Sequence, residues 1–364
     1  MKNEAKWTVL LLALLFFGMC VACWLKPAKE ASVTERRKLE QFPKFQAETF
    51  ADGSFMTDFE DYALDQFPMR DGFRRLKAWV SQNIFRKSDN NDIYVAEGYA
   101  VKMEYPLNED SIAYAGEGFE WIYENYLKEQ SGSIYVSVIP DKNYFLGEQT
   151  GHLSLDYEKL NGMLQEEMPY GEFIDLTDTL SIEDYYQTDI HWRQEKLVDT
   201  AKALGSGLGI TLQETYEQKT LTEEFYGVYF GQSALNLPGE TLSYLTNETL
   251  EQCTVEDYEN GKTLGIYDFA KAAGKDPYEL YLSGPVSLLK ITNPKSQSGK
   301  ELVVFRDSFG SSLIPLLAEG YETITLIDLR YISSRTLGSF VDFTGKEVLF
   351  LYSTSVLNHS ETLK

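Results

Sequence analysis

The chain has 364 residues, 43% of them hydrophobic, which is enough for a large core in one or two domains. Its formal net charge of -23 argues against binding nucleic acid, or an anionic membrane, through a basic surface. Its three cysteines offer no disulfide framework, because Cys20 and Cys23 lie in an apolar run and Cys253 stands alone.

An apolar stretch without charge runs from Trp7 to Leu25. A helix of about 20 such residues crosses the hydrocarbon core of a bilayer. Lys2 and Lys6 precede it and favour a cytoplasmic tail over residues 1–6. We therefore expect residues 7–25 to be a single-pass anchor, with the chain beyond it outside the cytoplasm. A cleavable signal peptide is the alternative, since Val21-Ala22-Cys23 is small enough to be cut.

Beyond the anchor, residues 26–48 are charged and contain proline, which is typical of a juxtamembrane linker. From residue 49 to 364 the apolar spacing alternates between the helical and the strand period. Helices are expected, in chain order, at 55–67, 76–85, 112–127, 157–167, 194–204 and 309–318. Strands are expected at 93–95, 99–101, 133–139, 173–176, 278–282, 301–305, 323–327 and 348–352. This alternation predicts an α/β domain with a mostly parallel sheet, and residues 215–300 are interpreted as an insertion with β character.

Asp189 and His191 form a candidate acid–base pair in a chain that has only three histidines. Histidine is the side chain best suited to general-base chemistry near neutral pH. Spaced i, i+2, the two side chains fall on the same face of an extended segment, where the carboxylate can orient the imidazole. The alternative is a structural histidine beside an aspartate that caps the following helix.

Ser308 is a candidate nucleophile because it lies where a predicted strand, 301–305, gives way to a predicted helix. That position exposes a hydroxyl at the carboxyl end of the sheet, and the helix N-terminal amides can stabilise an oxyanion there. The alternative is that Ser308 only caps the helix.

These residues carry a resemblance to a known family. Thr188-Asp189-Ile190-His191-Trp192, followed over a hundred residues later by Asp307-Ser308-Phe309, resembles the signature of the bacterial DHHW proteins and the related alginate O-acetylation proteins, which have an SGNH-hydrolase-like catalytic domain. The resemblance runs from about Glu35 to the C-terminus and includes Asp65-Gln66-Phe67-Pro68-Met69-Arg70, Pro140-Asp141-Lys142 and Asp328-Leu329-Arg330-Tyr331.

The resemblance implies an SGNH-hydrolase-like (flavodoxin-like) fold and an extracytoplasmic O-acetyltransferase or acetylesterase that acts on a polysaccharide of the cell surface. By this resemblance Ser308 is the nucleophile, His191 is the general base, and Asp189 is the acidic residue that orients His191. The implied partner is a polytopic acyltransferase of the MBOAT class. No cofactor is expected, and three dispersed histidines without a carboxylate cluster argue against a metal site.

The chain departs from the family pattern in ways that keep a second hypothesis open. Ile190 stands at the second letter of the DHHW name, and Arg306 stands where SGNH enzymes commonly have glycine. Arg306 could crowd the turn or bind an anionic substrate. The Gly and Asn blocks of a standard oxyanion hole have no clear counterpart. The alternative function is therefore a non-catalytic carbohydrate-binding or assembly subunit of an acetylation complex.

Four more side chains are candidates for substrate binding. Arg330 and Tyr331 follow the strand predicted at 323–327. Residues at the carboxyl ends of neighbouring strands face one crevice in an open α/β sheet, so these two are expected to lie in the same crevice as Ser308. A salt bridge would equally explain Arg330. Lys142 follows the first core strand and has the same two explanations. Trp192 is either a platform for a sugar ring or core packing.

Overall fold

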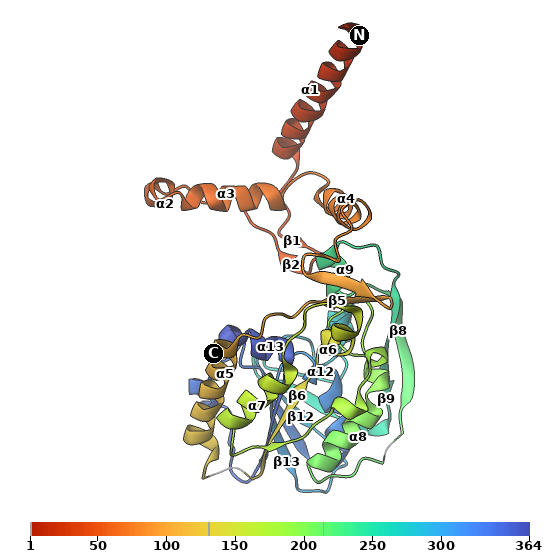
Figure 1. Cartoon of the computed structure of the whole chain (residues 1–364). Coiled ribbons are helices and arrows are strands. Elements are labelled where there is room, and N and C mark those ends of the chain that lie inside the picture. The colour runs from red at the N-terminus through yellow and green to blue at the C-terminus, as the bar shows by residue number, and fades with distance from the viewer. Residues whose placement is uncertain (1, 130–131, 214) are drawn as a thin grey trace. The chain divides into compact units, whose positions relative to one another are not determined.

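The structure is a computed structural model that describes residues 2–129, 132–213 and 215–364 (Figure 1). It divides into two compact units. The first unit is the chain up to Asn91 with Phe230–Asn236, and the second is Asp92–Tyr229 with Leu237–Lys364. Residues 49–91 thus group with the N-terminal part of the chain. The predicted division into a linker, residues 26–48, and a domain, residues 49–364, concerns which parts of the chain fold independently. This division stays a prediction.

The first unit begins with helix α1 (Lys2–Leu25), which carries the apolar segment Ala5–Leu25. With 21 residues and no buried side chain, this segment is long and apolar enough to cross a membrane, a criterion that a signal sequence also meets. The elements that follow are β1 (Ala31–Ser32), β2 (Arg37–Lys38), α2 (Ala47–Ala51), α3 (Ser54–Asp65) and α4 (Arg70–Asn83). The helix expected at 55–67 corresponds to α3, which ends before Pro68, and α4 starts after this proline.

The second unit is built on an eight-stranded mixed sheet. In spatial order the strands are β11 (Lys262–Leu264), β10 (Thr254–Asp257), β12 (Leu288–Thr292), β14 (Thr323–Ile327), β13 (Glu301–Arg306), β15 (Glu347–Ser353), β6 (Ile134–Ile139) and β7 (Glu172–Phe173). The strands from β14 to β7 pair in parallel, whereas β11, β10 and β12 add antiparallel pairs at one side. The predicted α/β class is confirmed, and three strands of the predicted insertion extend its sheet.

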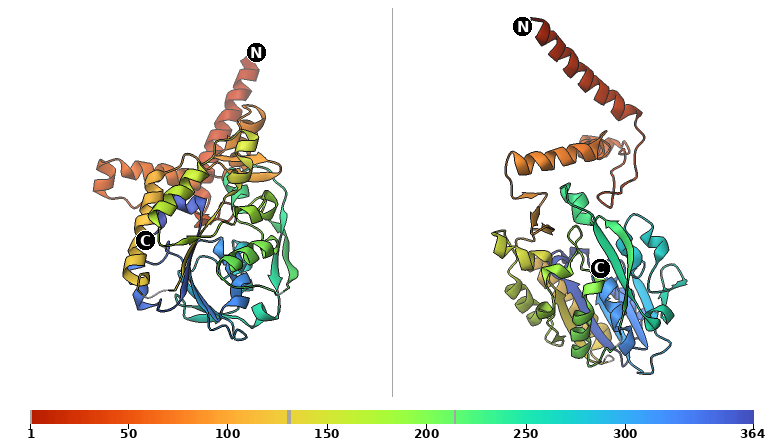
Figure 2. Two further views of the ribbon diagram at one scale, coloured as in Figure 1. Left: turned by 60° about the horizontal axis from the view of Figure 1, so that its bottom comes forward. Right: turned by 90° about the vertical axis from the view of Figure 1, so that its right-hand side faces the viewer.

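Helices cover both faces of this sheet, because its central strands are apolar on both sides (Figure 2). On β13, Leu302 and Val304 face the cluster that contains α8 (Val198–Gly207). Val303 and Phe305, which alternate with them, face the cluster that contains α5 (Glu109–Ile122) and α7 (Tyr157–Glu167). The apolar side chains of this predicted strand therefore pack into two hydrophobic cores, one on each face of the sheet.

Two predicted elements are wrong in ways that affect the site. Residues 278–282 form no strand but a 3₁₀ turn, Pro277–Leu280, because Pro277 fixes the backbone at its start and the Asp276 carboxylate accepts a hydrogen bond from the Tyr278 amide (3.0 Å). The helix predicted at 309–318 is a short α-helix, α12 (Gly310–Leu313), continued as a 3₁₀ helix. Pro315 has no N–H to donate to the Ser311 carbonyl, so the α-helix cannot continue through it.

The remaining short elements connect these layers. They are β4 (Ile93–Ala96) and β5 (Tyr99–Lys102), which pair around Glu97-Gly98 as predicted, α6 (Lys142–Leu146), β8 (Glu217–Phe225), α9 (Val228–Ser233), β9 (Glu240–Thr246), α10 (Glu248–Gln252), α11 (Phe269–Ala272) and α13 (Thr354–Asn358). Strands β8 and β9 pair with each other in a separate antiparallel sheet.

Candidate active site

Asp189 and His191 lie in a closed loop and not in the extended segment that the sequence predicts. An antiparallel bridge joins Tyr185 to Trp192, and the Tyr186 amide donates to the His191 carbonyl (3.0 Å). The loop between these points brings the two side chains together by bending. The Asp189 carboxylate then accepts from the His191 backbone amide through Oδ1 (3.1 Å). The pair is thus built locally, by a different geometry from the one expected.

A continuous hydrogen-bonded chain joins Asp189, His191 and Ser308. The distance from His191 Nδ1 to Asp189 Oδ1 is 2.6 Å, and that from His191 Nε2 to Ser308 Oγ is 2.8 Å. A carboxylate only accepts, so Nδ1 carries the proton and Nε2 is left to accept from the Ser308 hydroxyl. Asp189 is fully buried, His191 is nearly so, and Ser308 is partly exposed. The chain of groups therefore runs from the interior to an accessible hydroxyl.

The backbone of residues 227–228 holds the buried end of this chain. The Val228 amide donates to Asp189 Oδ2 (2.8 Å), and the Gly227 amide donates to the Thr188 hydroxyl (2.9 Å). Gly227 lies so close that an added Cβ would stand 2.3 Å from the Asp189 Cα. Both carboxylate oxygens are thus fixed, which leaves the imidazole a single orientation.

A short turn at the carboxyl end of β13 presents Ser308. The Asp307 carboxylate accepts from the Phe309 amide (2.9 Å) and from the Ser353 amide at the end of β15 (2.8 Å), and this ties the turn to the neighbouring strand. The Gly310 amide donates to the Asp307 carbonyl (3.2 Å). Three backbone amides, one carbonyl and one carboxylate thus define the turn.

These bonds change the expectation that the helix N-terminal amides form an oxyanion hole. The Phe309, Gly310 and Ser311 amides all donate within the turn, the last of them to the Ser308 carbonyl (3.2 Å). Among the described residues, none accepts a hydrogen bond from the Ser308 amide. The amide of Ser308 itself is the donor that the turn leaves open.

An aromatic layer packs against His191, and its main member was missed from the sequence. The ring of Tyr278 stacks on the imidazole with centroids 4.0 Å apart and planes 9° apart, and Phe309 lies at 5.1 Å. The Tyr278 hydroxyl is hydrogen-bonded to Ser312 Oγ (2.8 Å). Burial raises the pKa of Tyr278 well above its usual value, so the phenol stays neutral. Tyr278 lay in a predicted strand of the insertion, and no local motif marks it.

Three of the predicted substrate-binding residues are buried. The Trp192 indole donates to the Phe309 carbonyl (3.1 Å) and to Ser312 Oγ (2.9 Å), which is the core-packing alternative. The Arg306 guanidinium lies beneath the turn, where Nη1 donates to Ser311 Oγ (3.1 Å) and stands 3.7 Å from Asp328 Oδ2. Its Nε and Nη2 have no partner among the described residues. Neither side chain is presented to a substrate.

Lys142, the third buried residue, fastens the start of α6 to the loop that carries Asp189. Its Nζ donates to the Tyr186 carbonyl (2.9 Å) and lies 4.9 Å from the centroid of the Tyr229 ring. Burial lowers the pKa of this ammonium to about 7. The neighbouring Asp141, also buried, has its pKa raised to about 6 by burial. The structure therefore gives Lys142 a supporting position under the site.

Arg330 and Tyr331 differ in accessibility. Arg330 forms two hydrogen bonds with the Asp328 carboxylate, of 2.9 Å and 2.7 Å, which is the salt-bridge alternative. Tyr331 is exposed, and its ring lies 5.5 Å from the Arg330 guanidinium. Of the five predicted substrate-binding side chains, Tyr331 is the one open to solvent and Arg330 is partly so.

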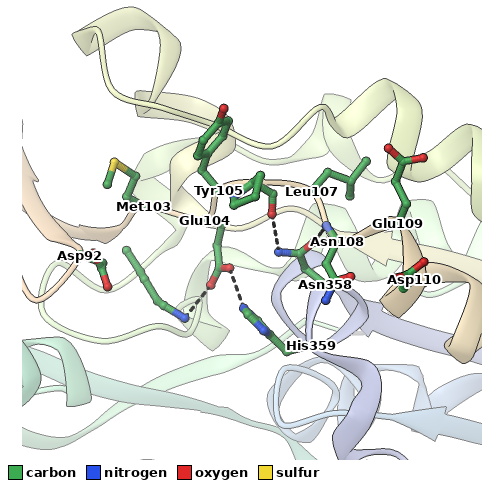
Figure 3. A pocket seen from close by; sticks show the side chains of 12 residues that line it. Asp92, Met103, Glu104, Tyr105, Leu107, Asn108, Glu109, Asp110, Asn358 and His359 are labelled. Atoms are coloured by element: carbon green, nitrogen blue, oxygen red, sulfur yellow. Dashed lines mark hydrogen bonds and ion pairs between the residues drawn. The ribbon is translucent and has the colours of Figure 1, made fainter.

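A cavity of about 770 Å³ is lined by Asp92 and by residues of the segments 102–110 and 358–359 (Figure 3). Glu104 lies at its base, where it pairs with Lys102 (3.1 Å), accepts from Ser355 Oγ (2.9 Å) and contacts the His359 ring (3.3 Å). Ser355 comes two residues after Ser353, which contacts the turn that presents Ser308. No sequence motif marks this cavity, because its lining comes from segments that are far apart in the chain.

Comparison with known proteins identifies the fold. No family model and no curated protein matches the chain. A solved DHHW family protein from Eubacterium siraeum is 19% identical, with a TM-score of 0.59 over 75% of this chain and 94% of that one. Bacillus cereus PatB1 is 19% identical, with a TM-score of 0.58 over 73% and 96%, and its structure with a sulfonyl adduct gives 0.56. At this identity the likeness establishes a shared fold, which confirms the predicted resemblance at that level.

Proposed function

We propose that this chain is a membrane-anchored, extracytoplasmic enzyme that transfers or removes acetyl groups on a polysaccharide. Ser308 is the nucleophile, His191 the general base and Asp189 the residue that orients His191. The observation that carries the proposal is the unbroken hydrogen-bonded chain from Asp189 Oδ1 through the His191 ring to Ser308 Oγ. The resemblance of the two motifs to the DHHW and alginate O-acetylation proteins supports the choice of acetyl ester and glycan.

The proposed reaction has two halves that share one intermediate. In the first, His191 Nε2 takes the Ser308 proton while Oγ attacks the acetyl carbonyl of the donor. The protonated His191 then gives that proton to the departing oxygen, and Ser308 is left as an acetyl ester. In the second, a glycan hydroxyl or water loses its proton to His191 and attacks the ester, which restores the Ser308 hydroxyl. The Ser308 amide is the proposed donor to the oxyanion in both halves.

The surroundings of the triad support the other parts of the proposal. Tyr331, with Arg330 behind it, offers an exposed aromatic ring for a sugar, and the cavity at Glu104 offers room for further residues of a glycan. Lys142, Arg306 and Trp192 are proposed to support the site from within. Helix α1 is proposed to anchor the chain, and an acyltransferase of the MBOAT class to supply the acetyl group.

Turnover of a chromogenic acetyl ester by the full-length chain in detergent tests the nucleophile. We expect Ser308→Ala and His191→Ala to lose roughly 10³-fold or more of the turnover. Ser339→Ala, an exposed serine in a 3₁₀ helix, is the matched control and should behave as wild type. Equal turnover by wild type and Ser308→Ala would remove Ser308 from the reaction.

One observation favours the alternative, a non-catalytic carbohydrate-binding or assembly subunit. The helix amides that would build a larger oxyanion hole are satisfied within the turn. Glycan binding that is retained in a protein with no measurable ester turnover and no trapped acyl-enzyme would establish this alternative. Addition of an oligosaccharide acceptor, with mass spectrometry for the gain of one acetyl group, separates transferase from esterase.

A further inference from the structure

Six aromatic side chains gather on one exposed face of the N-terminal unit. They are Phe42, Phe45, Phe50, Phe55, Phe59 and Tyr62, and are called the aromatic face below. The rings contact each other edge to face or at a tilt, with centroids 5.3 Å apart for Phe42 and Tyr62 and 5.7 Å apart for Phe45 and Phe55. Phe45 remains 68% exposed and Phe42 60% exposed despite these contacts. Exposed aromatic clusters of this kind are rare on a surface that faces only water.

Helix α3 presents the aromatic face as an amphipathic stripe. Phe55, Phe59 and Tyr62 follow the i, i+4, i+7 spacing that places side chains on one side of a helix. Thr57, Glu60 and Asp61 lie on the other side. Of the residues of α2 and α3, only Asp65 is buried, so this stripe is not a core face within the described parts of the chain. An apolar stripe that packs on no core needs another apolar medium.

Hydrogen bonds fasten the C-terminal end of α3 to the end of the apolar helix α1. Lys26, the first residue after α1, donates from Nζ to the Gln66 carbonyl (3.2 Å). The buried Gln66 side chain accepts from the Lys29 amide (2.9 Å) and donates to the Lys29 carbonyl (2.8 Å). Since α3 ends at Asp65, its last turn is held where α1 leaves the bilayer. Lys26 and Lys29, in the predicted juxtamembrane linker, are therefore tied to the end of α3.

The charge of this part of the chain is compatible with a lipid surface. Residues 26–91 contain 12 Lys and Arg against 11 Asp and Glu, whereas residues 92–364 contain 19 against 44. The strong negative charge of the protein thus lies almost wholly outside the N-terminal unit. Headgroups repel the region next to α1 weakly, and the apolar stripe decides the interaction.

From these observations we infer that the aromatic face lies in the interfacial layer of the bilayer, as a second membrane contact beside α1. The inference rests on the proposed anchoring by α1. Phe and Tyr rings settle at the boundary of headgroups and acyl chains, and an amphipathic helix there buries its apolar side by several ångströms. The occupant of this face is lipid, and the N-terminal unit lies on the membrane surface with its acidic residues outward.

Single-cysteine labelling of the full-length chain in phosphatidylcholine vesicles tests this. Cys20, Cys23 and Cys253 are replaced by alanine, and a nitrobenzoxadiazole dye is placed at Ala63→Cys, one turn after Phe59 on the same side of α3. Thr57→Cys, on the other side of α3, is the matched control. A third chain keeps Cys20, which is exposed on α1, as its one cysteine and reports on the anchor. Lipid carrying a doxyl quencher near the headgroup measures contact with the acyl chains.

We expect strong quenching and a blue-shifted emission at Ala63→Cys, little at Thr57→Cys, and quenching at Cys20. Phe55→Ser with Phe59→Ser should reduce the quenching at Ala63→Cys toward the control. Equal, weak quenching on both sides of α3 with a quenched Cys20 overturns the inference and leaves the anchor intact. A blue-shifted but unquenched emission at Ala63→Cys means that protein, and not lipid, covers the aromatic face. In these vesicles that protein is a second copy of the chain, and this result also overturns the inference. An unquenched Cys20 removes the anchor itself.

Discussion

Replacement of Tyr278 separates what its ring and its hydroxyl do for the site. Tyr278→Leu removes the ring that stacks on the imidazole of His191 at 4.0 Å, with the planes 9° apart. Tyr278→Phe keeps the ring and removes the hydroxyl that is hydrogen-bonded to Ser312 Oγ at 2.8 Å. The two variants therefore test whether Tyr278 acts on the base or only on the fold around it.

The magnitude follows from the geometry of the stack. An aromatic pair is worth about 0.5–1.5 kcal/mol beyond its burial, and a desolvated cation over a ring gains about 2 kcal/mol. In the proposed reaction the imidazole becomes a cation in the transition state, so loss of the ring should raise the barrier by roughly 0.5–2 kcal/mol. At 1.36 kcal/mol for each tenfold change, turnover by Tyr278→Leu falls about 2- to 30-fold.

Hydrolysis of a chromogenic acetyl ester measures this loss. Tyr278→Phe is the matched control, with turnover within about twofold of wild type and about 1 kcal/mol less stability from the lost hydrogen bond. Wild-type turnover in Tyr278→Leu would refute the reasoning. Equal losses in the two variants would place the effect in the hydroxyl and refute it as well.

Three further substitutions probe the support of the triad. Asp189→Asn should lower ester turnover by roughly 10³- to 10⁴-fold, because its amide nitrogen must face either the His191 ring N–H or the Val228 amide, both donors; a loss below about tenfold would contradict this. Gly227→Ala sets a Cβ 2.3 Å from the Asp189 Cα. We therefore expect ester turnover to be lost while the circular dichroism spectrum of the protein stays unchanged. Wild-type turnover would contradict the close approach of Gly227 to Asp189. Burial lowers the pKa of Lys142 from 10.5 to about 7, so between these values the unfolded chain binds the extra proton and stability rises with pH. In urea titrations over this pH range, the free energy of unfolding of wild type relative to that of Lys142→Met should increase by up to about 1.4 kcal/mol per pH unit. A difference that stays constant with pH would contradict this prediction.

The sequence was informative about Asp189, His191 and Ser308, which the structure joins by hydrogen bonds, because each is tied to a local pattern. The strand–turn at Ser308 and the short spacing of Asp189 and His191 can both be recognised without a fold. The bending of the loop at 185–192 could not, since the bridge that closes it and the packing of Trp192 are tertiary contacts. The structure does bring together the two side chains that the spacing paired, but through a bent loop and not through an extended segment.

The rest of the site depends on contacts between distant segments. Tyr278 reaches His191 from an insertion whose turn is set by Pro277, and no periodicity predicts which ring will stack on the base. Arg306 and Arg330 both face one buried carboxylate, that of Asp328, and strand order decides this partner. The amides expected to stabilise the oxyanion donate within the turn instead, and the strand–turn pattern does not reveal these bonds.

Intact-mass and peptide mass spectrometry after treatment with a sulfonyl fluoride test the central claim most directly. An activated serine attacks the sulfonyl sulfur, fluoride leaves, and the sulfonyl group stays on the oxygen. We predict one sulfonyl group per chain in wild type, on Ser308, none in Ser308→Ala, and slow labelling in His191→Ala because Ser308 has lost its base. Labelling of Ser308→Ala to the same extent as wild type, or of another residue in wild type, would contradict a nucleophilic Ser308.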